Sequence, residues 1–358
     1  MRAIFAGGGT AGHINPAISA AQELCRRYPD AKIMFIGVKG HMEETLCEKA
    51  GFPISFIRVA GFDRRHLLKN VKIAGDALKA ISDAKKIIRE FAPDVVVGTG
   101  GYVSGPVVYA ASRLKIPTVI HEQNVLAGVT TKLLCRVVKA VGTAFSECKL
   151  PKCRKKVCVG NPLRAELFGI SREEARAKLG IPQDAPFVVG IGGSLGARAI
   201  NENMLALMHA APETMYVWLS AGKGGYEKVY PKAPKKPGCQ VLPYIYNAGE
   251  VYAAADLLVC RAGAITLSEL NAMGKPAVLI PSPYVAENHQ EHNARLQQER
   301  GAAVMLTEAE LNEQLFLDTV FGLVNNPEKL KEMSVASSFM GVRDATLRFC
   351  DLIERVAR

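Results

Sequence analysis

Short apolar runs alternate with amphipathic segments along the first half of the chain. The runs are typical of buried strands, and the segments between them have the apolar spacing that predicts helices. We predict strands at Arg2–Ala6, Lys32–Ile36, Asp94–Gly98 and Thr118–His121, and helices at Ile14–Arg27, His41–Ala50, Leu78–Phe91 and Gly105–Leu114. Strands and helices in alternation indicate a parallel sheet with helices on both faces.

The second half of the chain repeats this arrangement. We predict strands at Phe187–Ile191, Tyr216–Leu219, Gln240–Leu242, Leu257–Cys260 and Ala277–Pro281, and helices at Ala199–Ala210, Thr266–Met273 and Gln290–Arg300. The glycine-rich run 8–12 resembles the run 192–196, and the segment 94–120 resembles 256–279 in the same order. Any two strand–helix units look somewhat alike, but the matching order favours an α/β protein of two Rossmann-like doubly wound parallel-sheet domains that face each other across a cleft.

Length and local composition suggest where the two domains meet. The chain has 358 residues, which is too many for one simple doubly wound domain and suits two. The joint is expected at Gly160–Pro162, just before a charged segment. We therefore predict domains at residues 1–161 and 162–340. Residues 341–358 are predicted to form a C-terminal helix, and its return to the first domain is left open.

Composition and charge limit the class of protein. Hydrophobic residues make up 49% and charged residues 22%, which is ordinary for a globular protein. The net charge of +11 favours an anionic partner: nucleic acid, a phosphorylated small molecule or an anionic membrane surface. Neither zinc-finger spacing nor an aromatic RNA-binding signature occurs, so we do not expect nucleic acid. Nine scattered cysteines indicate no disulfide framework and favour a reducing compartment.

No targeting or membrane-spanning segment is expected. The chain leads from Met1 directly into an apolar strand, which is unlike a signal peptide. The uncharged span 95–112 is long enough to raise the question of a membrane helix. Its glycines and its proline instead predict a strand, a loop and the start of a helix.

The first glycine-rich loop has the spacing of a dinucleotide-binding loop, with Gly7, Gly9 and Gly12 in place. A NAD site also has an acidic residue at the end of the second strand, where it binds the ribose. Here that strand continues to Lys39 without an acid. Lys39 would suit NADP, yet nothing else in the chain supports hydride chemistry. A dinucleotide is therefore not expected.

Three glycine-rich loops can still hold anions, at residues 7–13, 98–105 and 192–196. Glycines let the backbone approach a phosphate, and the N–H groups at a helix start carry partial positive charge. Three such loops are more than one dinucleotide needs. They suit two phosphorylated ligands that meet in one cleft.

His13 ends the first loop, beside a predicted helix start. The positive end of a helix disfavours a protonated imidazole, so His13 can stay neutral and accept a proton. A capping or core histidine is the commoner alternative. The neighbouring phosphate loop favours a catalytic base.

The segment Cys260–Glu269 ends an apolar strand, turns at Gly263 and starts a helix. The first amides of this helix can hold a diphosphate, and the Glu269 carboxylate can bridge two ribose hydroxyls. A capping-box glutamate is an equally good interpretation of Glu269. Amide side chains between Asn288 and Asn293 can contact sugar hydroxyls, although Asn288 can instead cap a helix.

No metal is expected. The chain contains no Asp-x-Asp triplet, the usual motif of glycosyltransferases that hold a diphosphate through a divalent ion. Cys148, Cys153 and Cys158 have neither a CxxC pair nor a nearby histidine, which makes a metal site improbable. Amides and a helix dipole would then stabilise a departing diphosphate.

Six motifs in one order resemble the MurG family, the peptidoglycan N-acetylglucosaminyltransferases of the GT-B fold. They are Gly7–His13, Gly100–Pro106, His121–Asn124, Gly160–Arg164, Gly192–Ala197 and Arg261–Glu269, and they span nearly the whole chain. The resemblance implies inverting transfer of N-acetylglucosamine from UDP-N-acetylglucosamine to the C4 hydroxyl of the muramoyl sugar of lipid I, the undecaprenyl-diphosphate-linked acceptor, which gives lipid II. It further implies that no cofactor is needed and that the protein is peripheral on the cytoplasmic face of the cell membrane. Residues 1–161 would serve the acceptor and the membrane, and residues 162–340 the donor.

Position by position, the resemblance also implies site residues. His13 matches the base. The donor-binding positions are Thr10, Ala11, Gly12, Asn124, Arg164, Ser194, Ile245, Ala264, Ile265, Thr266, Leu267, Ser268, Glu269 and Gln290. Ile245 would contact the uracil through its backbone, Glu269 the ribose and Gln290 the sugar. Ala11 replaces a glycine of many relatives, and little effect is expected because alanine takes ordinary backbone angles.

A lipid acceptor implies a further partner, the anionic inner leaflet of the membrane. The segment His66–Phe91 mixes apolar residues with lysines such as Lys69 and Lys72, which suits an interfacial surface. We predict contact at Phe62–Gly75. An ordinary amphipathic helix packed on the core is the alternative, chiefly for the second half of the segment.

Three other functions were weighed against the transferase. Another GT-B enzyme, such as a glycolipid synthase or a UDP-sugar epimerase, shares the fold, but an epimerase needs its own acid–base set, which we do not find. A nicotinamide oxidoreductase lacks the acid after the second strand. A non-catalytic membrane-bound scaffold would not need intact donor-site motifs.

Overall fold

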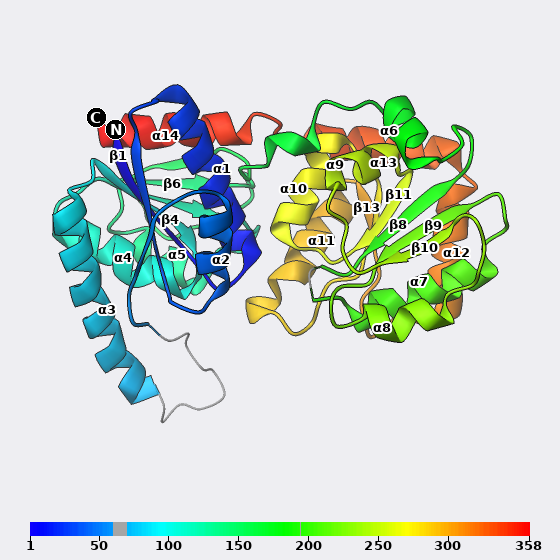
Figure 1. Cartoon of the computed structure of the whole chain (residues 1–358), viewed down its shortest axis with the longest axis horizontal. Coiled ribbons are helices and arrows are strands. Elements are labelled where there is room, and N and C mark those ends of the chain that lie inside the picture. The colour runs from blue at the N-terminus through cyan, green and yellow to red at the C-terminus, as the bar shows by residue number, and fades with distance from the viewer. Residues whose placement is uncertain (60–69, 194) are drawn as a thin grey trace. The chain divides into compact units, whose positions relative to one another are not determined.

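The structure is a computed structural model that describes the chain except for residues 60–69 and 194, and without the side chains of 60–75 and 286. The chain forms two compact units (Figure 1). Unit 1 contains Met1–Arg164 together with Val342–Arg358, and unit 2 contains Ala165–Gly341. The last segment of the chain thus belongs with the first.

Unit 1 is built on a parallel sheet of seven strands in the order β3-β2-β1-β4-β5-β6-β7. The strands are β1 Arg2–Gly7, β2 Lys32–Gly37, β3 Ile54–Phe56, β4 Val95–Gly100, β5 Thr118–Glu122, β6 Ala140–Thr143 and β7 Lys156–Cys158. The helices are α1 Ala11–Arg27, α2 Met42–Lys49, α3 Asn70–Phe91, α4 Gly101–Arg113, α5 Val129–Leu134 and α14 Ala345–Ala357. The central pairing sets Ala3 beside Val95 and Phe5 beside Phe35.

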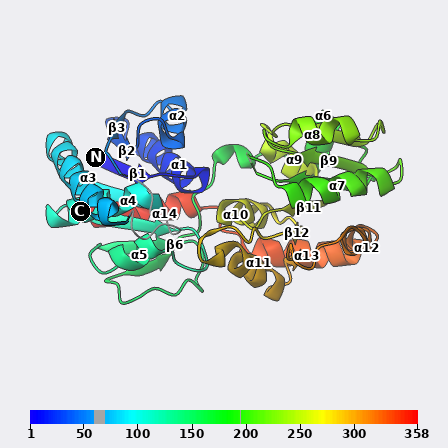
Figure 2. The same cartoon turned by 90° about the horizontal axis from the view of Figure 1, so that it is seen from below.

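Alternate residues of β1 point to opposite faces of this sheet, as the pleat of a strand requires. Ala3 and Phe5 pack with α1 and α14 on one face. Ile4 and Ala6 pack with α3 and α4 on the other, and these two helices lie side by side (Figure 2). Both faces are buried, which explains why the strands read as continuous apolar runs.

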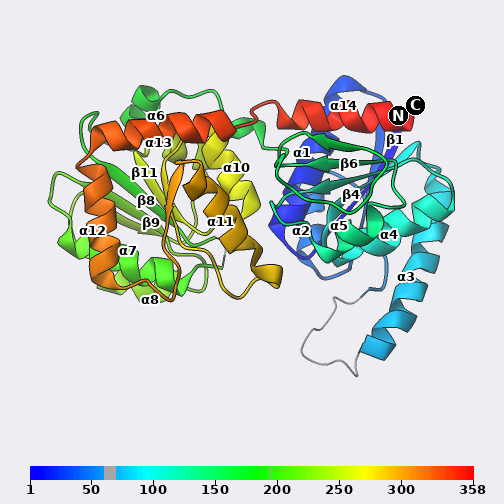
Figure 3. The same ribbon diagram turned by 180° about the vertical axis from the view of Figure 1, so that it is seen from behind.

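The C-terminal helix α14 completes the first of these cores. It lies beside α1 (Figure 3). Its side chains Phe349, Leu352 and Ile353 are buried among residues of α1 and the sheet. At the surface, Arg27 of α1 donates hydrogen bonds to Asp351 at 2.6 Å and Glu354 at 2.7 Å. Apolar burial and ion pairs together hold α14 on unit 1.

Unit 2 has a parallel sheet of six strands in the order β10-β9-β8-β11-β12-β13. The strands are β8 Phe187–Ile191, β9 Tyr216–Ser220, β10 Cys239–Leu242, β11 Leu257–Cys260, β12 Ala277–Leu279 and β13 Ala303–Met305. The helices are α6 Arg172–Leu179, α7 Arg198–Ala210, α8 Tyr226–Val229, α9 Ala248–Ala254, α10 Ala264–Met273, α11 His289–Glu299, α12 Glu313–Val324 and α13 Pro327–Met340, with 3-10 turns η2 Ala165–Leu167, η3 Tyr230–Lys232 and η4 Ala286–Asn288.

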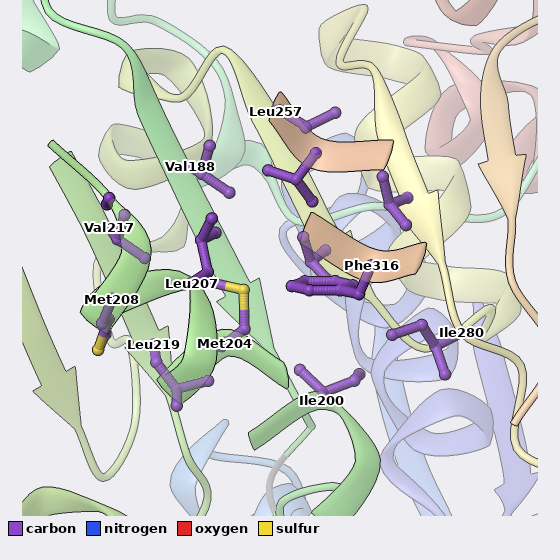
Figure 4. Packing of buried hydrophobic residues seen from close by; sticks show 14 of the residues in the cluster. Val188, Ile200, Met204, Leu207, Met208, Val217, Leu219, Leu257, Ile280 and Phe316 are labelled. Carbon is purple, nitrogen blue, oxygen red and sulfur yellow. The ribbon is translucent and has the colours of Figure 1, made fainter. Parts of the chain in front are cut away.

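One face of the second sheet is covered by α7 and α12 (Figure 4). Met204 and Leu207 of α7 and Phe316 of α12 are fully buried against Val188 of β8. Burial of such side chains stabilises the unit by about 2 kcal/mol each. The two sheets confirm the predicted fold class of two Rossmann-like parallel-sheet domains.

The structure differs from the predicted elements at their ends and edges. Helix α1 begins at Ala11, not at Ile14, and α4 begins at Gly101, not at Gly105. The first turn of a helix makes no bonds to earlier carbonyls, so it tolerates glycines that read as loop. The short strands β3, β6, β7 and β13 were not predicted, because three or four residues carry little pattern and β3 and β7 are only half buried.

Arg176 of α6 joins several elements of unit 2 from a fully buried position. Its guanidinium donates to the carbonyls of Ala254, Pro182, Gln183 and Ala185 at 2.7–3.0 Å. It also donates to Asp256 Oδ2 at 2.6 Å. The helices α6 and α9 and the starts of β8 and β11 are therefore held by one cation.

Replacing Arg176 is expected to destabilise unit 2. Arg176→Ala leaves four carbonyls without their buried donor and removes one of the three donors of Asp256, which costs about 3–5 kcal/mol. Arg172 bonds the same carboxylate at 2.9 Å from a side chain that is 38% exposed, so Arg172→Ala should cost about 1 kcal/mol or less. The single tryptophan, Trp218, lies in β9 of unit 2, so its fluorescence during urea unfolding measures both losses. Equal losses in the two variants would contradict this account.

Among the helices that the structure describes, none combines the length and the hydropathy needed to cross a bilayer.

Candidate active site

The predicted site residues of unit 1 gather at the carboxyl edge of its sheet. The strand order reverses between β1 and β4, and in unit 2 it reverses between β8 and β11. In open α/β sheets, ligands bind outside the carboxyl ends of the strands at such a reversal. The loops that follow these four strands are the glycine-rich loops and the segment Arg261–Gly263.

The loop after β1 is held against the loop after β4 by contacts that only glycine allows. A Cβ at Gly8 would lie 2.6 Å from the Val103 side chain, and a Cβ at Gly101 would overlap the Gly8 carbonyl oxygen. Gly9 has φ +85°, in the left-handed region that favours glycine. The two backbones therefore touch, and both helices start beside this contact.

His13 lies in the first turn of α1, as the third residue of the helix, and not at the end of a loop as predicted. Its Nδ1 is 3.2 Å from the Gly8 carbonyl oxygen and 3.2 Å from Thr10 Oγ1. Because a carbonyl oxygen only accepts, this contact requires the proton of a neutral imidazole to be on Nδ1. The other nitrogen, Nε2, is then the basic one, as a proton acceptor needs.

The other predicted residues of the first loop surround His13. Thr10 is the N-cap of α1, and Ala11 and Gly12 are its first two residues. The first turn contains no acidic side chain that would offset the partial positive charge of the helix start, which suits this end of α1 to an anionic ligand.

Asn124 follows β5 at the same edge of the sheet, and the buried Glu122 orients it. Glu122 Oε1 accepts from the backbone and the side-chain nitrogens of Asn124, both at 3.1 Å. Its Oε2 accepts from Gly128 N at 3.0 Å and from Thr131 Oγ1 at 2.5 Å. Four donors satisfy this buried carboxylate, which fixes the direction of the Asn124 amide.

His121, in the same motif, is a structural residue. Its Nε2 donates to the Gly160 carbonyl at 2.8 Å, and its Nδ1 accepts from Gln123 Nε2 at 3.1 Å. The ring packs edge-on against Phe349 of α14, with centroids 4.8 Å apart. Complete burial lowers the pKa of His121 to about 4, so the imidazole stays neutral.

Unit 2 contains a cavity of about 630 Å³ at the carboxyl edge of its sheet. Its lining comes from the loops after β8, β11, β12 and β13 and from α7 and α11: Gly192, Gly196, Ala197, Arg198, Ala199, Glu202, Arg261, Ser282, Tyr284, Gln290 and Glu308. Gln290 Oε1 accepts from Ser282 N at 2.9 Å, which aims the amide of Gln290. Arg261 pairs with Glu308 at 2.5 Å and donates to the Ile280 carbonyl at 3.0 Å.

Helix α10 starts directly after β11, with Gly263 as its N-cap. The first turn contains no acidic residue, so its amides are suited to an anion. Glu269 is the sixth residue of the helix and is 7% exposed. A capping box needs a side chain at the N-cap and a glutamate at the third position, so the capping interpretation of Glu269 is wrong.

Glu269 and α11 lie close to the end of β11. Burial raises the pKa of Cys260 to about 12, and the charge of Glu269 adds to this shift, which places that carboxylate near the strand end. Asn293 of α11, fully buried, donates to the Ala262 carbonyl at 3.2 Å. The hydrogen bond from Asn293 thus ties the turn between β11 and α10 to α11.

The remaining predicted positions are less closely grouped. Ile245 is 7% exposed in the stretch that follows β10. Arg164 is exposed at the end of the long segment of unit 1. Ser194 lies outside the described residues. Within each unit, then, Thr10–His13 with Asn124 and Ala264–Glu269 with Gln290 occupy the carboxyl edge.

Sequence reasoning assigned no role to Arg261, Ser282 or Glu122. Arg261 directly follows β11 and Ser282 comes three residues after the end of β12, and such positions are expected to face a ligand. That placement was the available signal. Glu122 had no signal, because its role depends on donors that lie up to nine residues away. In the part of the chain that the structure describes, no group of three His, Cys, Asp or Glu is arranged to hold a metal ion.

Comparison with known proteins agrees with these two halves. The family description "Glycosyltransferase family 28 N-terminal domain" matches residues 3–143, and "Glycosyltransferase family 28 C-terminal domain" matches residues 187–353. The UDP-N-acetylglucosamine--N-acetylmuramyl-(pentapeptide) pyrophosphoryl-undecaprenol N-acetylglucosamine transferase of Acetivibrio thermocellus is 43% identical over 100% of this chain and 99% of its own. The transferase of the same name from Caldanaerobacter subterraneus subsp. tengcongensis is 41% identical over 99% and 100%.

Solved structures show the same relation. MurG of Acinetobacter baumannii matches with a TM-score of 0.82 and 31% identity over 99% of both chains. The UDP-GlcNAc 2-epimerase of Neisseria meningitidis matches with a TM-score of 0.68 at 12% identity over 99% of this chain and 100% of its own, which shows a shared fold alone.

The buried His121 makes stability depend on pH. Its pKa is about 4 in the folded protein and about 6.5 in the unfolded chain, so the unfolded chain binds more protons between these values. The contribution of His121 to the free energy of unfolding is fully present above about pH 6.5. It falls as pH drops toward 4, by about 2 kcal/mol at pH 5. Urea unfolding followed by circular dichroism should show this loss, and His121→Gln should remove it. The exposed His209, changed to Gln, is the control and should leave the pH slope unaltered.

Proposed function

The chain belongs to the MurG family of GT-B glycosyltransferases, within glycosyltransferase family 28, and on that premise we propose that it forms lipid II. It would move N-acetylglucosamine from UDP-N-acetylglucosamine to the C4 hydroxyl of the muramoyl-pentapeptide of undecaprenyl-diphosphate lipid I, for peptidoglycan synthesis. The observation that carries the substrates is 43% identity, over the whole chain, to a relative named for this donor and acceptor. The geometry of each unit supports it.

His13 is the proposed base. Inversion at the anomeric carbon requires the C4 hydroxyl oxygen to attack C1 while the bond from C1 to the UDP oxygen breaks. The hydroxyl proton passes to Nε2 of His13, and the electron pair of the broken bond passes to UDP. The Nδ1–H contact with Gly8 supports this role because it leaves the lone pair on Nε2.

The donor would be bound mainly by unit 2. The acid-free first turn of α10 suits the diphosphate, and Glu269, one turn further along, suits the ribose hydroxyls. Gln290 lines the cavity and suits the sugar, and Ile245, Ser194 and the first-loop residues remain proposed donor contacts by family resemblance. Amides and the helix dipole stabilise the departing UDP in this proposal, so no divalent ion is required.

The proposed reaction is tested by direct transfer. Purified protein with UDP-N-acetylglucosamine and a lipid I analogue, in excess EDTA, should yield the disaccharide product and UDP. His13→Ala should lower turnover by about 100-fold or more, the usual contribution of a general base, while UDP still raises the melting temperature as in the unaltered protein.

Two outcomes would count against this proposal. Unchanged turnover in His13→Ala would remove the base assignment. Conversion of the donor to its 2-epimer without acceptor would favour the epimerase alternative, whose structural relatives share the fold.

A lipid acceptor requires contact with a membrane, and we propose that the protein binds the cytoplasmic leaflet through α3 and the segment before it. The predicted contact Phe62–Gly75, with Lys69 and Lys72, lies outside the residues whose side chains are described. In the second half of the helix, Ala80, Ala84 and Ile88 are buried against the core, as the alternative interpretation held. Leu78 is 70% exposed and Lys79 has a side chain that is 68% exposed, so the outer face offers one apolar and one basic side chain there, beside Asp76, which lies 4.0 Å from Lys79.

Changing Leu78 to Ser together with Lys79→Glu should weaken binding to anionic vesicles. Reversing one charge near an anionic surface costs about 2 kcal/mol, so partitioning should fall by about tenfold or more. Cosedimentation with vesicles of phosphatidylglycerol and phosphatidylcholine measures it. Val335→Ser with Lys331→Glu on α13 is a matched control, because both side chains are exposed in unit 2. Equal loss in the two pairs would indicate a charge effect without a defined surface.

A further inference from the structure

A buried carboxylate accepts a hydrogen bond from the backbone of the first glycine loop. Glu43 is the second residue of α2, and it is 1% exposed. Its Oε2 accepts from the backbone N–H of Gly9 at 3.3 Å, and its Oε1 accepts from Val38 N at 3.2 Å. Among the described residues it forms no ion pair with lysine or arginine. In the part of the chain that the structure describes, two backbone amides donate to this carboxylate, and a buried charge with that support needs an explanation beyond loop bracing.

One peptide group connects Glu43 to His13. The N–H of Gly9 and the C=O of Gly8 belong to the same peptide, which is trans. The N–H donates to Glu43, and the carbonyl accepts from Nδ1 of His13 at 3.2 Å. In a trans peptide these two groups point in opposite directions, so the peptide lies between the carboxylate and the imidazole.

This peptide is enclosed on several sides and cannot turn away. A Cβ at Gly8 would lie 2.9 Å from Glu43 Oε1 and 2.6 Å from Val103, and a Cβ at Gly9 would lie 3.1 Å from the Tyr102 ring. The backbone of Gly101 covers the Gly8 carbonyl. Gly8 N donates to the Gly100 carbonyl at 3.4 Å, which adds a tie to the neighbouring loop.

We propose that Glu43 is a positioning residue for His13 and acts through the Gly8–Gly9 peptide. A carboxylate on the N–H polarises the peptide, and hydrogen bonds in a row strengthen one another in a low-dielectric interior. The Gly8 carbonyl becomes a stronger acceptor, which holds the proton on Nδ1 and makes Nε2 more basic. The inference rests on the proposed role of His13 as base.

The proton count of the reaction is unaffected. The acceptor hydroxyl gives its proton to Nε2, the Nδ1 proton stays between His13 and Gly8, and Glu43 remains a carboxylate throughout. The negative charge favours the imidazolium that forms, and it opposes the positive start of α1, which disfavours that cation.

Other polar groups also face this region. Thr10 Oγ1 is a second acceptor for Nδ1, at 3.2 Å. Tyr102 of α4 bonds His41 Nδ1 at 3.1 Å, and burial together with the charge of Glu43 raises the pKa of Tyr102. The same charge reaches Cys47 on α2, whose pKa burial raises to about 12. Neither Tyr102 nor Cys47 changes charge near neutral pH, so Glu43 is the charged neighbour to test.

The first measurement uses the unaltered protein. With ¹⁵N-labelled histidine, NMR distinguishes the two neutral forms of each imidazole, and His13→Gln assigns the His13 signal. We expect His13 to carry its proton on Nδ1 at neutral pH. A proton on Nε2 would overturn the proposal without any variant of Glu43.

The second measurement compares two neighbouring carboxylates on one helix. Glu44 accepts from Gly40 N at 2.6 Å and braces a different loop, so Glu44→Gln removes the same charge without touching the Gly8–Gly9 peptide. Glu43→Gln should lower kcat about tenfold and move the NMR titration midpoint of His13 down by about half a pH unit. Glu44→Gln should leave both unchanged.

These readouts separate positioning from bracing. If Glu43→Gln lowers kcat without moving the midpoint of His13, the carboxylate is only a brace and the proposal fails. If that variant does not fold, the tautomer in the unaltered protein decides alone. The NMR titration does not depend on turnover, so it separates this inference from the proposed base. If Glu43→Gln shifts the midpoint of His13 but His13→Ala remains active, His13 is not the base, and the link from Glu43 to His13 through the peptide still holds.

Discussion

Close contact between backbones governs both units, because it places the helix starts where the strands end. In unit 1 a Cβ at Gly101 would overlap the Gly8 carbonyl, and in unit 2 a Cβ at Gly196 would overlap that of Ala221. A side chain at either glycine would force the loops apart, because its Cβ would lie inside van der Waals contact of the facing carbonyl oxygen. The start of α1, the direction of His13 and the shape of the cavity in unit 2 all depend on these contacts, so the glycines serve geometry before they serve any ligand.

The two units place negative charge differently around their strand ends. In unit 1 the Gly9 amide already donates to Glu43, and the Asn124 amide after β5 donates to Glu122. In unit 2 the first turn of α10 contains no acid and its cap has no side chain. Of the three glycine-rich loops that the sequence offered as anion sites, the first therefore already has one amide bonded to a carboxylate of the chain itself. Internal carboxylates stiffen the side that would hold the base, whereas the helix start that would hold a diphosphate has no acidic side chain in its first turn.

Much of this arrangement was predictable from sequence, for physical reasons. Apolar runs such as Phe187–Ile191 predicted central strands because both of their faces are buried. Glycines marked the loops because their backbone angles exclude other residues. Short edge strands such as Lys156–Cys158 escaped prediction, since half-exposed positions obey no strict pattern.

The candidate site was less predictable than the fold. His13 and Glu269 could be found because each belongs to a helix that starts at a glycine-containing turn, His13 in its first turn and Glu269 as its sixth residue. The residues around them could not be found from the sequence. Glu43 belongs to no recognisable motif, and its hydrogen bond to Gly9 joins residues that are 34 positions apart. The family resemblance supplied Ile245, which no local pattern distinguishes, and it selected Gln290 from the amide side chains between Asn288 and Asn293. Hydrogen bonds between residues far apart in the sequence were therefore not predictable.

The membership of α14 in unit 1 has a consequence for synthesis. Residues 165–341 are an insertion between two parts of one core, and Phe349, Leu352 and Ile353 are made after all of unit 2. On the ribosome, α1 and the first sheet must wait with an uncovered apolar face while the second sheet folds. The first unit to begin is therefore the last to finish, and a nascent chain without its final helix exposes the surface that most invites aggregation.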